Sequence, residues 1–373
     1  MMTKCKLCGK EDRLISSILR ICLDCLRKGV NGWEREVSRA HKISKTKWGL
    51  PFQPPKAPNG VVCPLCSNKC SIGNNGKGFC GLLTNRNGKL SYLIRLRGYA
   101  VAEWYYDPIP TNCVASWFCP ATTGAGYPKY ALSKEGERGY YNLAVFYGAC
   151  NLDCLYCQNW HYRRLTAELN PLVSTEELVK AALNEKVTCI CFFGGDPTPQ
   201  LPHALAVAKE SLRKRKGKIL RICWETNGLM SRDLLNEVIK VSLSSGGIIK
   251  VDVKAWNPRV YKALTGADGK AVWENLKFIA KFLKFREEVP LLAVSTLLVP
   301  GYVDVLEVRM IARFIASLDP SIPYTLLAFH PDYLMDDLPP TSLKHASEAL
   351  KVAKEEGLTN VRISNVWLLG PYY

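Results

Sequence analysis

Hydrophobic residues recur with two alternating periods from residue 141 to the end of the chain. Short apolar runs rich in β-branched residues predict strands, which are located at 141–147, 187–193, 219–224, 248–253, 291–298, 324–329 and 361–366. Apolar positions spaced by three or four residues predict helices between them, at 174–184, 200–215, 232–243, 258–286, 305–318 and 342–356. Strands that alternate with helices of this length indicate an α/β fold with a parallel sheet. Six such units are too few for a closed eightfold barrel, so we expect a partial (β/α)6 barrel with its chemistry at the carboxyl ends of the strands.

The chain before this pattern is cysteine-rich and less regular. Residues 1–50 predict a small module with a basic helix, and a proline-rich linker follows at 51–58. The segment 51–140 holds a second cysteine-rich stretch and short β-like pieces. No apolar run reaches the ~20 residues that a membrane span needs, and the first residues lack a hydrophobic signal core. We therefore expect three regions, 1–50, 51–140 and 141–373, in a cytoplasmic protein with no membrane partner.

The chain is basic, with 50 Lys and Arg against 33 Asp and Glu and a net charge of +17. Residues 1–60 hold 13 basic and 5 acidic residues of this total. Such a segment attracts RNA, anionic cofactors or an acidic protein surface, or it is simply a solvated face. Both interpretations stand for residues 1–60. The basic run at 213–218 ends a predicted helix, where cations complement the helix dipole, so a solvated helix end is favoured there.

Sixteen cysteines in a chain expected to be cytoplasmic favour metal ligation over disulfides, because reducing compartments keep thiols reduced. The first set has the zinc-ribbon spacing C-x2-C-x13-C-x2-C and comprises Cys5, Cys8, Cys22 and Cys25. This spacing predicts a structural zinc, with a rubredoxin-like iron as the alternative. The second set comprises Cys63, Cys66, Cys70 and Cys80. Its spacing does not decide between zinc and an auxiliary iron–sulfur cluster.

Five further cysteines have no ligand spacing. Cys113 and Cys119 lie in an irregular stretch, where they either extend a metal site near the mouth of the barrel or are packed. Cys189, Cys191 and Cys223 lie inside apolar predicted strands, and we expect them to be core residues, since a free cysteine packs as a small hydrophobe.

Three cysteines follow the first predicted strand of the barrel at the spacing CxxxCxxC. They are Cys150, Cys154 and Cys157. Three thiolates on one loop can hold three irons of a [4Fe–4S] cluster and leave the fourth iron open. A zinc knuckle is the alternative, but it normally needs a fourth ligand that this loop lacks. The cluster is therefore the favoured interpretation.

With this motif, the chain resembles the radical S-adenosylmethionine (SAM) superfamily over residues 141–366. Tyr156 matches the aromatic residue that the family places against the SAM adenine. Gly194, Gly195, Asp196 and Pro197 resemble the family's GGEP motif, with Asp in place of Glu, whose backbone holds the SAM amino group. Alone, this tetrapeptide would be an ordinary turn, but it comes one βα unit after the cysteines.

Three later strand ends resemble glycyl-radical activating enzymes within that superfamily. Glu225, Thr226 and Asn227 are similar to the (D/E)TNG motif, whose side chains meet the ribose and carboxylate of SAM; a helix N-cap is the alternative. Asp252 and Lys254 match a DxK motif in which the lysine neutralises the SAM carboxylate. His330 falls where those enzymes place a SAM-contacting histidine, although a lone histidine is more often structural.

The second cysteine set and the residues after it resemble the AmmeMemoRadiSam-type proteins, which are related to pyruvate formate-lyase activating enzymes. The resemblance implies reductive cleavage of SAM to a 5′-deoxyadenosyl radical that abstracts hydrogen from a protein or peptide, as an activase does. It also implies an electron donor such as ferredoxin or flavodoxin. The alternatives are a radical methyltransferase acting on a protein residue, with cobalamin as a further cofactor, and an RNA-modifying enzyme. A non-catalytic zinc-ribbon binding module would leave the CxxxCxxC motif unexplained.

Overall fold

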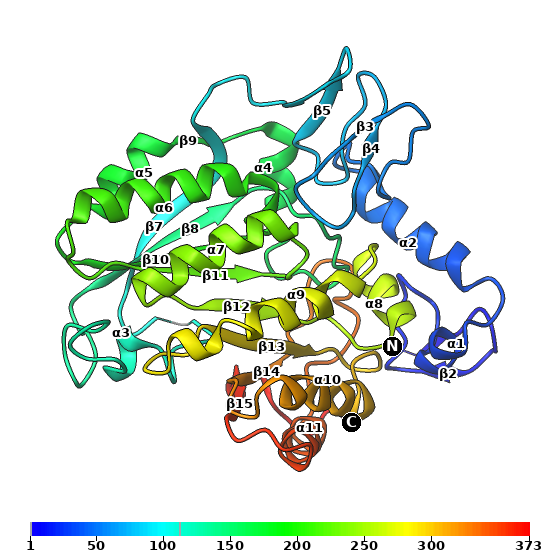
Figure 1. The fold of residues 1–373 in the computed structure, drawn as a ribbon. Helices are drawn as coiled ribbons and strands as arrows, with labels where there is room; N and C mark the ends of the chain where they lie inside the picture. Colours follow the sequence, from blue (N-terminus) through cyan, green and yellow to red (C-terminus); the bar gives the residue numbers. More distant parts are fainter. Residues whose placement is uncertain (1, 112) are drawn as a thin grey trace.

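The computed structural model of the chain describes residues 2–111 and 113–373. Its centre is a nine-stranded sheet in the order β15-β14-β13-β12-β11-β10-β8-β7-β9 (Figure 1). The parallel strands are β8 (Tyr141–Tyr147), β10 (Val187–Gly194), β11 (Arg221–Thr226), β12 (Ile249–Asp252), β13 (Leu292–Leu298), β14 (Tyr324–Ala328) and β15 (Val361–Ser364). Successive parallel strands are neighbours, and in the described part of the chain no pairing joins the edge strands β15 and β9, so the sheet stays open. The expected α/β fold with a mostly parallel sheet is confirmed.

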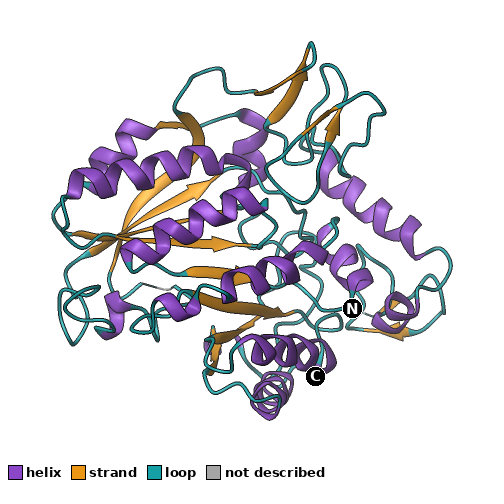
Figure 2. Cartoon of the chain, viewed as in Figure 1, coloured by secondary structure: helices purple, strands orange, loops and turns teal. Residues whose placement is uncertain are grey.

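Helices connect successive parallel strands and cover one face of the sheet (Figures 1 and 2). They are α4 (Tyr162–Glu168), α5 (Thr175–Ala182), α6 (Leu201–Arg215), α7 (Arg232–Ser245), α8 (Pro258–Thr265), α9 (Lys270–Ala280), α10 (Val305–Leu318) and α11 (Leu343–Glu355), with 3-10 turns at Thr198–Gln200, Leu283–Phe285 and Val366–Leu368. Side chains cap several N-termini: Ser174 accepts from the amide of Glu177, and Asp304 from that of Glu307. No helix in the described part of the chain is both long and apolar enough to cross a membrane.

The sheet begins before residue 141. β7 (Tyr99–Pro108) pairs antiparallel with β8, and β9 (Leu172–Ser174) pairs antiparallel with β7. The sequence YAVAEWYYDP lacks the long apolar run of the other strands, since only one side of β7 is buried along most of its length. A strand from the segment 51–140 therefore extends the sheet of the barrel.

Residues 113–140, between β7 and β8, lie at the amino ends of the parallel strands and include the short helix α3 (Pro120–Thr123) (Figure 1). A buried ion pair fixes this segment, with Arg221 Nη2 2.6 Å from Glu137 Oε2. Arg221 also donates to the carbonyl of Tyr130 at 2.7 Å. The segment therefore closes the base of the barrel opposite the strand ends that were expected to carry the chemistry.

The N-terminal region forms two small modules beside the barrel (Figure 1). The first contains β1 (Thr3–Lys4), β2 (Glu11–Asp12), α1 (Leu23–Lys28) and α2 (Trp33–Thr46); the second contains β3 (Val61–Val62), β4 (Ser71–Ile72), β5 (Leu83–Arg86) and β6 (Lys89–Tyr92). Arg27 joins the first module to α10 through two ion pairs. Its Nη2 atom lies 2.6 Å from Asp304 Oδ1 and 2.9 Å from Glu307 Oε1. A Cβ at Gly301 would lie 2.1 Å from the carbonyl oxygen of Leu14, so the module packs backbone to backbone against the loop after β13.

Candidate functional site

A pocket of about 230 Å³ lies at the carboxyl ends of the parallel strands. The loop after β8 and strands β10 to β14 all contribute to its lining. Of the residues that the sequence singled out, the pocket is lined by Cys150, Cys154, Tyr156, Cys157, Gly194, Gly195, Asp196, Glu225, Thr226, Asn227, Asp252 and Lys254. Residues spread over about 100 positions of the chain thus meet around one cavity, as expected for the strand ends of one parallel sheet.

The cysteine loop leaves β8 through a tight backbone contact with β10. The amide of Asp196 donates to the carbonyl of Ala149 at 3.0 Å, and the amide of Gly195 donates to that of Tyr147 at 3.0 Å. A Cβ at Gly195 would lie 2.2 Å from the oxygen of Ala149, and one at Gly194 would lie 2.4 Å from the amide nitrogen of Tyr147. Both glycines are therefore required for the close approach of these two strand ends.

The three thiols of this loop face the pocket together. Cys150 and Cys154 are buried and Cys157 is partly exposed. Burial raises the pKa of Cys150, and it raises the pKa of Cys154 to about 12, so these two thiols stay protonated without a metal. No other cysteine in the described chain lines this pocket. Three soft sulfur donors with no fourth fit a [4Fe–4S] cluster with one open iron.

Asp196, Thr226 and Asn227 tie two strand ends together. The Asp196 carboxylate accepts from the Thr226 hydroxyl at 3.0 Å and from the Asn227 amide at 2.7 Å. The Asn227 side chain donates to Asn151 Oδ1 at 2.6 Å, next to Cys150 in the chain. The Asp196 carboxylate is therefore engaged within the protein, where it links the ends of β10 and β11.

Two charged pairs lie inside the barrel, on β11, on β12 and directly after the end of β12. Lys254 pairs with Asp252, and Lys250 Nζ lies 2.7 Å from Glu225 Oε1. Burial favours neutral forms, but the paired charges outweigh it: the pKa of Lys254 is raised and that of Glu225 is lowered. Asp252 Oδ1 is buried and has no hydrogen-bond partner among the described residues. The pocket therefore offers the ammonium groups of Lys250 and Lys254 and one unsatisfied acceptor, which suit the carboxylate and the hydroxyl or amino groups of SAM.

Lys250 is a pocket residue that the motifs did not indicate. A lysine at the centre of an apolar strand was a usable signal, because such a residue is buried only with a partner. Two of the residues expected to bind SAM lie outside the lining. Pro197 starts the turn before α6, and the His330 side chain is 53% exposed and 3.2 Å from Asp332. The role of His330 stays a prediction that this geometry does not support.

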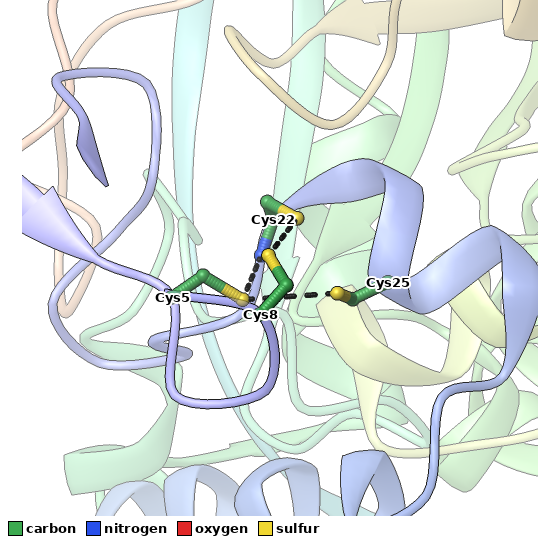
Figure 3. A group of neighbouring side chains, drawn as sticks. All are labelled: Cys5, Cys8, Cys22 and Cys25. Carbon is green, nitrogen blue, oxygen red and sulfur yellow. Dashed lines mark hydrogen bonds between the residues drawn. The ribbon is translucent and has the colours of Figure 1, made fainter. Parts of the chain in front are cut away.

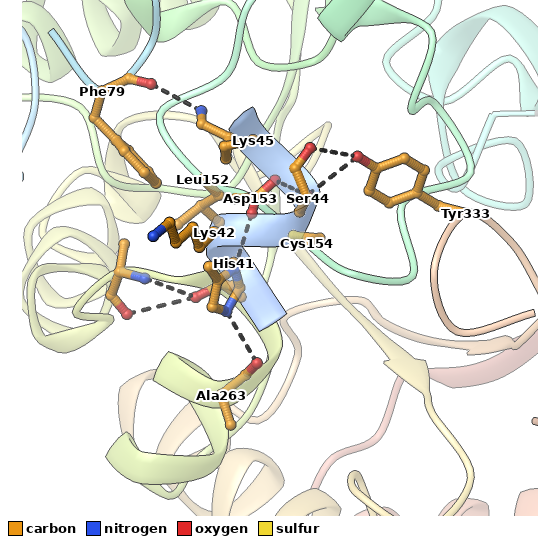
Figure 4. Close-up of polar contacts among 12 residues, drawn as sticks. His41, Lys42, Ser44, Lys45, Phe79, Leu152, Asp153, Cys154, Ala263 and Tyr333 are labelled. Atoms are coloured by element: carbon orange, nitrogen blue, oxygen red, sulfur yellow. Dashed lines mark hydrogen bonds and ion pairs between the residues drawn. The ribbon is translucent and has the colours of Figure 1, made fainter. Parts of the chain in front are cut away.

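A polar network anchors the cysteine loop from behind (Figure 4). Asp153 is fully buried and accepts from His41 Nδ1 at 2.8 Å, Ser44 Oγ at 2.8 Å and Arg163 Nη2 at 2.7 Å. Arg163, itself buried, and the other partners lower the pKa of Asp153 against the effect of burial. His41 and Ser44 belong to α2, so the N-terminal helix holds the loop that carries the three cysteines.

The ribbon cysteines form a compact group (Figure 3). The Sγ atoms of Cys5 and Cys25 are 3.9 Å apart, and those of Cys8 and Cys22 are 3.7 Å apart. Four sulfurs at a Zn–S distance of about 2.3 Å in tetrahedral geometry are about 3.8 Å apart. Within the described residues this is the only group of three or more His, Cys, Asp or Glu residues whose ligand atoms all lie within 4.8 Å of one another. The geometry fits one tetrahedral metal ion.

The second cysteine set is more open. Cys63, Cys66, Cys70 and Cys80 surround a cavity of about 10 Å³ that Asn151 also lines. No three of these sulfurs all lie within 4.8 Å of one another, as the ribbon sulfurs do. Asn68 of this module donates to the carbonyl of Asn151 at 2.7 Å, directly beside Cys150. The second set is therefore a neighbour of the cysteine loop rather than a remote appendage.

Comparison with known proteins agrees with this geometry. The family model of the Radical SAM superfamily matches residues 144–315. An uncharacterized protein of Methanocaldococcus jannaschii is 28% identical over 313 residues, which cover 83% of this chain and 82% of that protein. A second protein of this archaeon, named "Putative glycyl-radical enzyme activating enzyme", is 29% identical over 187 residues, covering 48% of this chain and 64% of that protein. A domain of pyruvate-formate lyase-activating enzyme from Bacteroides vulgatus aligns at 18% identity over 47% of this chain and 98% of that domain, with a TM-score of 0.38.

Proposed function

Residues 144–315 of this chain form a radical SAM domain, and on this premise we propose that the protein reductively cleaves SAM at a [4Fe–4S] cluster held by Cys150, Cys154 and Cys157. The observation that carries the proposal is the pocket in which these three thiols face the polar groups of β11 and β12. With cluster and SAM bound, the site would supply a 5′-deoxyadenosyl radical that abstracts hydrogen from a substrate.

The protein's own residues would bind and orient SAM. Lys254 would neutralise the SAM carboxylate, and Asp252 Oδ1 would accept a hydrogen bond from a hydroxyl or amino group, which would satisfy a buried acceptor. The flat backbone at Gly194 and Gly195 leaves the pocket wall without side chains. Burial of the cysteine loop would keep water and other hydrogen donors away from the reaction.

We propose that the substrate is a protein or peptide, on which the enzyme acts as an activase does. The support is the (D/E)TNG-like and DxK-like strand ends and the similarity to the protein named as an activating enzyme in Methanocaldococcus jannaschii. The same pocket would also serve methyl transfer to a protein residue, which product analysis would distinguish. A ferredoxin or flavodoxin would supply the electron.

One observation favours RNA as a second candidate substrate. Trp160 follows the cysteine loop, and its ring stacks on that of Tyr333 with 6.0 Å between the ring centroids. The ring centroid of Trp48 lies 6.3 Å from that of Trp160. The Nζ atom of Lys47 lies over the Tyr333 ring, 4.7 Å from its centroid. Trp160 is 38% exposed, so its ring is available to a ligand. Aromatic rings beside a cation are typical of single-strand nucleic-acid binding.

We further propose zinc at the ribbon and an auxiliary iron–sulfur cluster at the second cysteine set. The ribbon sulfurs have the separation of a single tetrahedral ion. The sulfurs of the second set are not as close together as those of the ribbon. Thiolates that bind several sulfide-bridged irons lie farther apart than thiolates that bind one ion. The contact between Asn68 and Asn151 would place that cluster next to the SAM cluster, where it could relay electrons.

The first experiment measures 5′-deoxyadenosine formed from SAM under anaerobic reduction. The triple variant Cys150→Ala/Cys154→Ala/Cys157→Ala should form none, and Cys8→Ala, which alters only the ribbon, should retain the activity. Undiminished product in the triple variant would overturn the proposal.

The second experiment identifies the substrate class. Cell lysate is treated with protease or with nuclease, and each sample is tested for stimulation of SAM cleavage by the purified enzyme. We expect protease to remove the stimulation and nuclease to leave it unchanged. The opposite result would replace the protein substrate with RNA.

A further inference from the structure

The sixteen cysteines fall into four groups in space. Eleven belong to the ribbon, to the second set and to the cysteine loop. The remaining five line a single cavity of about 40 Å³ at the base of the barrel and comprise Cys113, Cys119, Cys189, Cys191 and Cys223. We call them the base cysteines. Each of the other three groups has the geometry or spacing of a metal site, and no cysteine stands outside the four groups.

The base cysteines come from two directions. Cys189 and Cys191 lie on β10 and Cys223 lies on β11, and all three line the cavity from the strands. Cys113 and Cys119 lie on the segment that closes the base of the barrel, so they line it from below. Local sequence spacing therefore could not have shown this set. The expectation that the strand cysteines are core residues agrees with the burial of Cys189 and Cys191, whereas Cys223 is only partly buried, and it did not include their shared cavity.

Lys250 connects this cavity to the SAM pocket, because it lines both. Its ammonium lies 3.0 Å from Cys113 Sγ, 3.2 Å from Cys191 Sγ and 2.7 Å from Glu225 Oε1. An ammonium has three protons and no acceptor, so both sulfurs serve as acceptors. Packing of thiols as small hydrophobic residues would not require a buried cation beside them. The thiolate is the form of cysteine that binds a metal, and a buried ammonium at this distance would stabilise a thiolate at either sulfur.

From this arrangement we propose that the base cysteines hold an additional iron–sulfur cluster, separated from the SAM pocket by Lys250 and Glu225. Their sulfurs are not gathered like those of the ribbon, in keeping with several bridged irons rather than one ion. Lys250 would donate N–H···S hydrogen bonds that offset the negative charge of the cluster. The proposal rests on the base cavity and not on the identity of the substrate.

The test compares iron and acid-labile sulfide per chain in anaerobically reconstituted full-length protein. The variant Cys189→Ser/Cys191→Ser/Cys223→Ser removes every strand thiol of the cavity. Ala293→Ser is the matched control, since Ala293 is buried in the same small hydrophobic cluster and carries no thiol. We expect the triple variant to lose about two to four irons with equivalent sulfide, while the control loses none. Equal iron content in a folded triple variant, or a loss of zinc alone, would overturn the proposal.

A second measurement needs no variant. Anomalous diffraction at the iron edge from anaerobic crystals of the unaltered protein should show a peak between β10, β11 and the loop that carries Cys113. The absence of such a peak, with the iron at Cys150, Cys154 and Cys157 visible in the same crystal, would overturn the proposal. Because iron is located independently of SAM cleavage, failure of the base site and failure of the proposed activity are distinguishable.

Discussion

His41 and Asp153 form a buried hydrogen bond of 2.8 Å that joins the N-terminal helix α2 to the loop of Cys150, Cys154 and Cys157. The second ring nitrogen of His41 lies 3.1 Å from the carbonyl oxygen of Ala263. Each ring nitrogen thus lies within hydrogen-bond distance of an acceptor, and the two contacts fix the orientation of the ring. The small module in front of the barrel is therefore part of the support of the proposed cluster.

Replacement of Asp153 should destabilise this support. Asp153→Asn leaves the buried guanidinium of Arg163 without its charge partner, which costs about 3–5 kcal/mol of unfolding free energy. We expect a lower melting temperature and weaker retention of iron under chelation. Asp332→Asn, which breaks the exposed pair with His330, is the control and should change neither. An Asp153→Asn protein as stable as the original would show that the network is not a support.

Gly195→Ala tests the contact between two strand ends. The added Cβ would lie 2.2 Å from the carbonyl oxygen of Ala149, so the cysteine loop must shift. We expect a loss of about 1–3 kcal/mol in stability and reduced iron content, measured by chemical denaturation and iron analysis. Gly88→Ala meets no atom within 4 Å and introduces only backbone strain at φ +79°, so it separates the steric effect from general glycine loss. Equal iron content in both variants would contradict the steric argument.

His203 should make stability depend on pH. Burial lowers the pKa of His203 from 6.5 to about 4, while Tyr147 lies 2.8 Å from its Nδ1. Because the folded state holds the proton less tightly than the unfolded state, stability should fall as pH drops from about 6.5 to 4 and level off below that. The difference corresponds to up to about 3 kcal/mol.

Denaturant unfolding of the protein and of His203→Gln over this pH range measures the effect. The variant should lack this part of the decline, although the contribution of the carboxylates remains in both proteins. Parallel curves for the two proteins would show that His203 does not titrate as proposed.

Removal of the ribbon metal should leave the chemistry largely in place. Cys25→Ser removes one of four sulfurs that are spaced for a single ion, so we expect about one zinc less per chain. The contacts of Arg27 with Asp304 and Glu307 lie outside the metal site and should keep the module docked. Zinc content and 5′-deoxyadenosine yield are the measurements. Loss of all SAM cleavage in a folded variant would make the ribbon part of the catalytic machinery.

The sequence alone determined the local features of this protein. Apolar periodicity placed the strands of the parallel sheet within about three residues, because side-chain alternation and helical spacing are properties of neighbouring residues. The spacing of the ribbon cysteines and of Cys150, Cys154 and Cys157 was equally local. Polar motifs after successive strands predicted a shared pocket, since parallel strands end at one edge. Their binding roles remain predictions, and the geometry does not extend to His330.

Tertiary structure alone decided the contacts between distant segments. β7 joined the sheet although its own pattern is weak, because pairing with β8 supplies its hydrogen bonds. His41 met Asp153 across 112 positions, and Lys250 met Cys113 across 137. No local period encodes such pairs, because they depend on how whole elements pack. The base cysteines are the clearest case: in sequence they look like scattered core residues, and only the closed base of the barrel brings all five to one cavity.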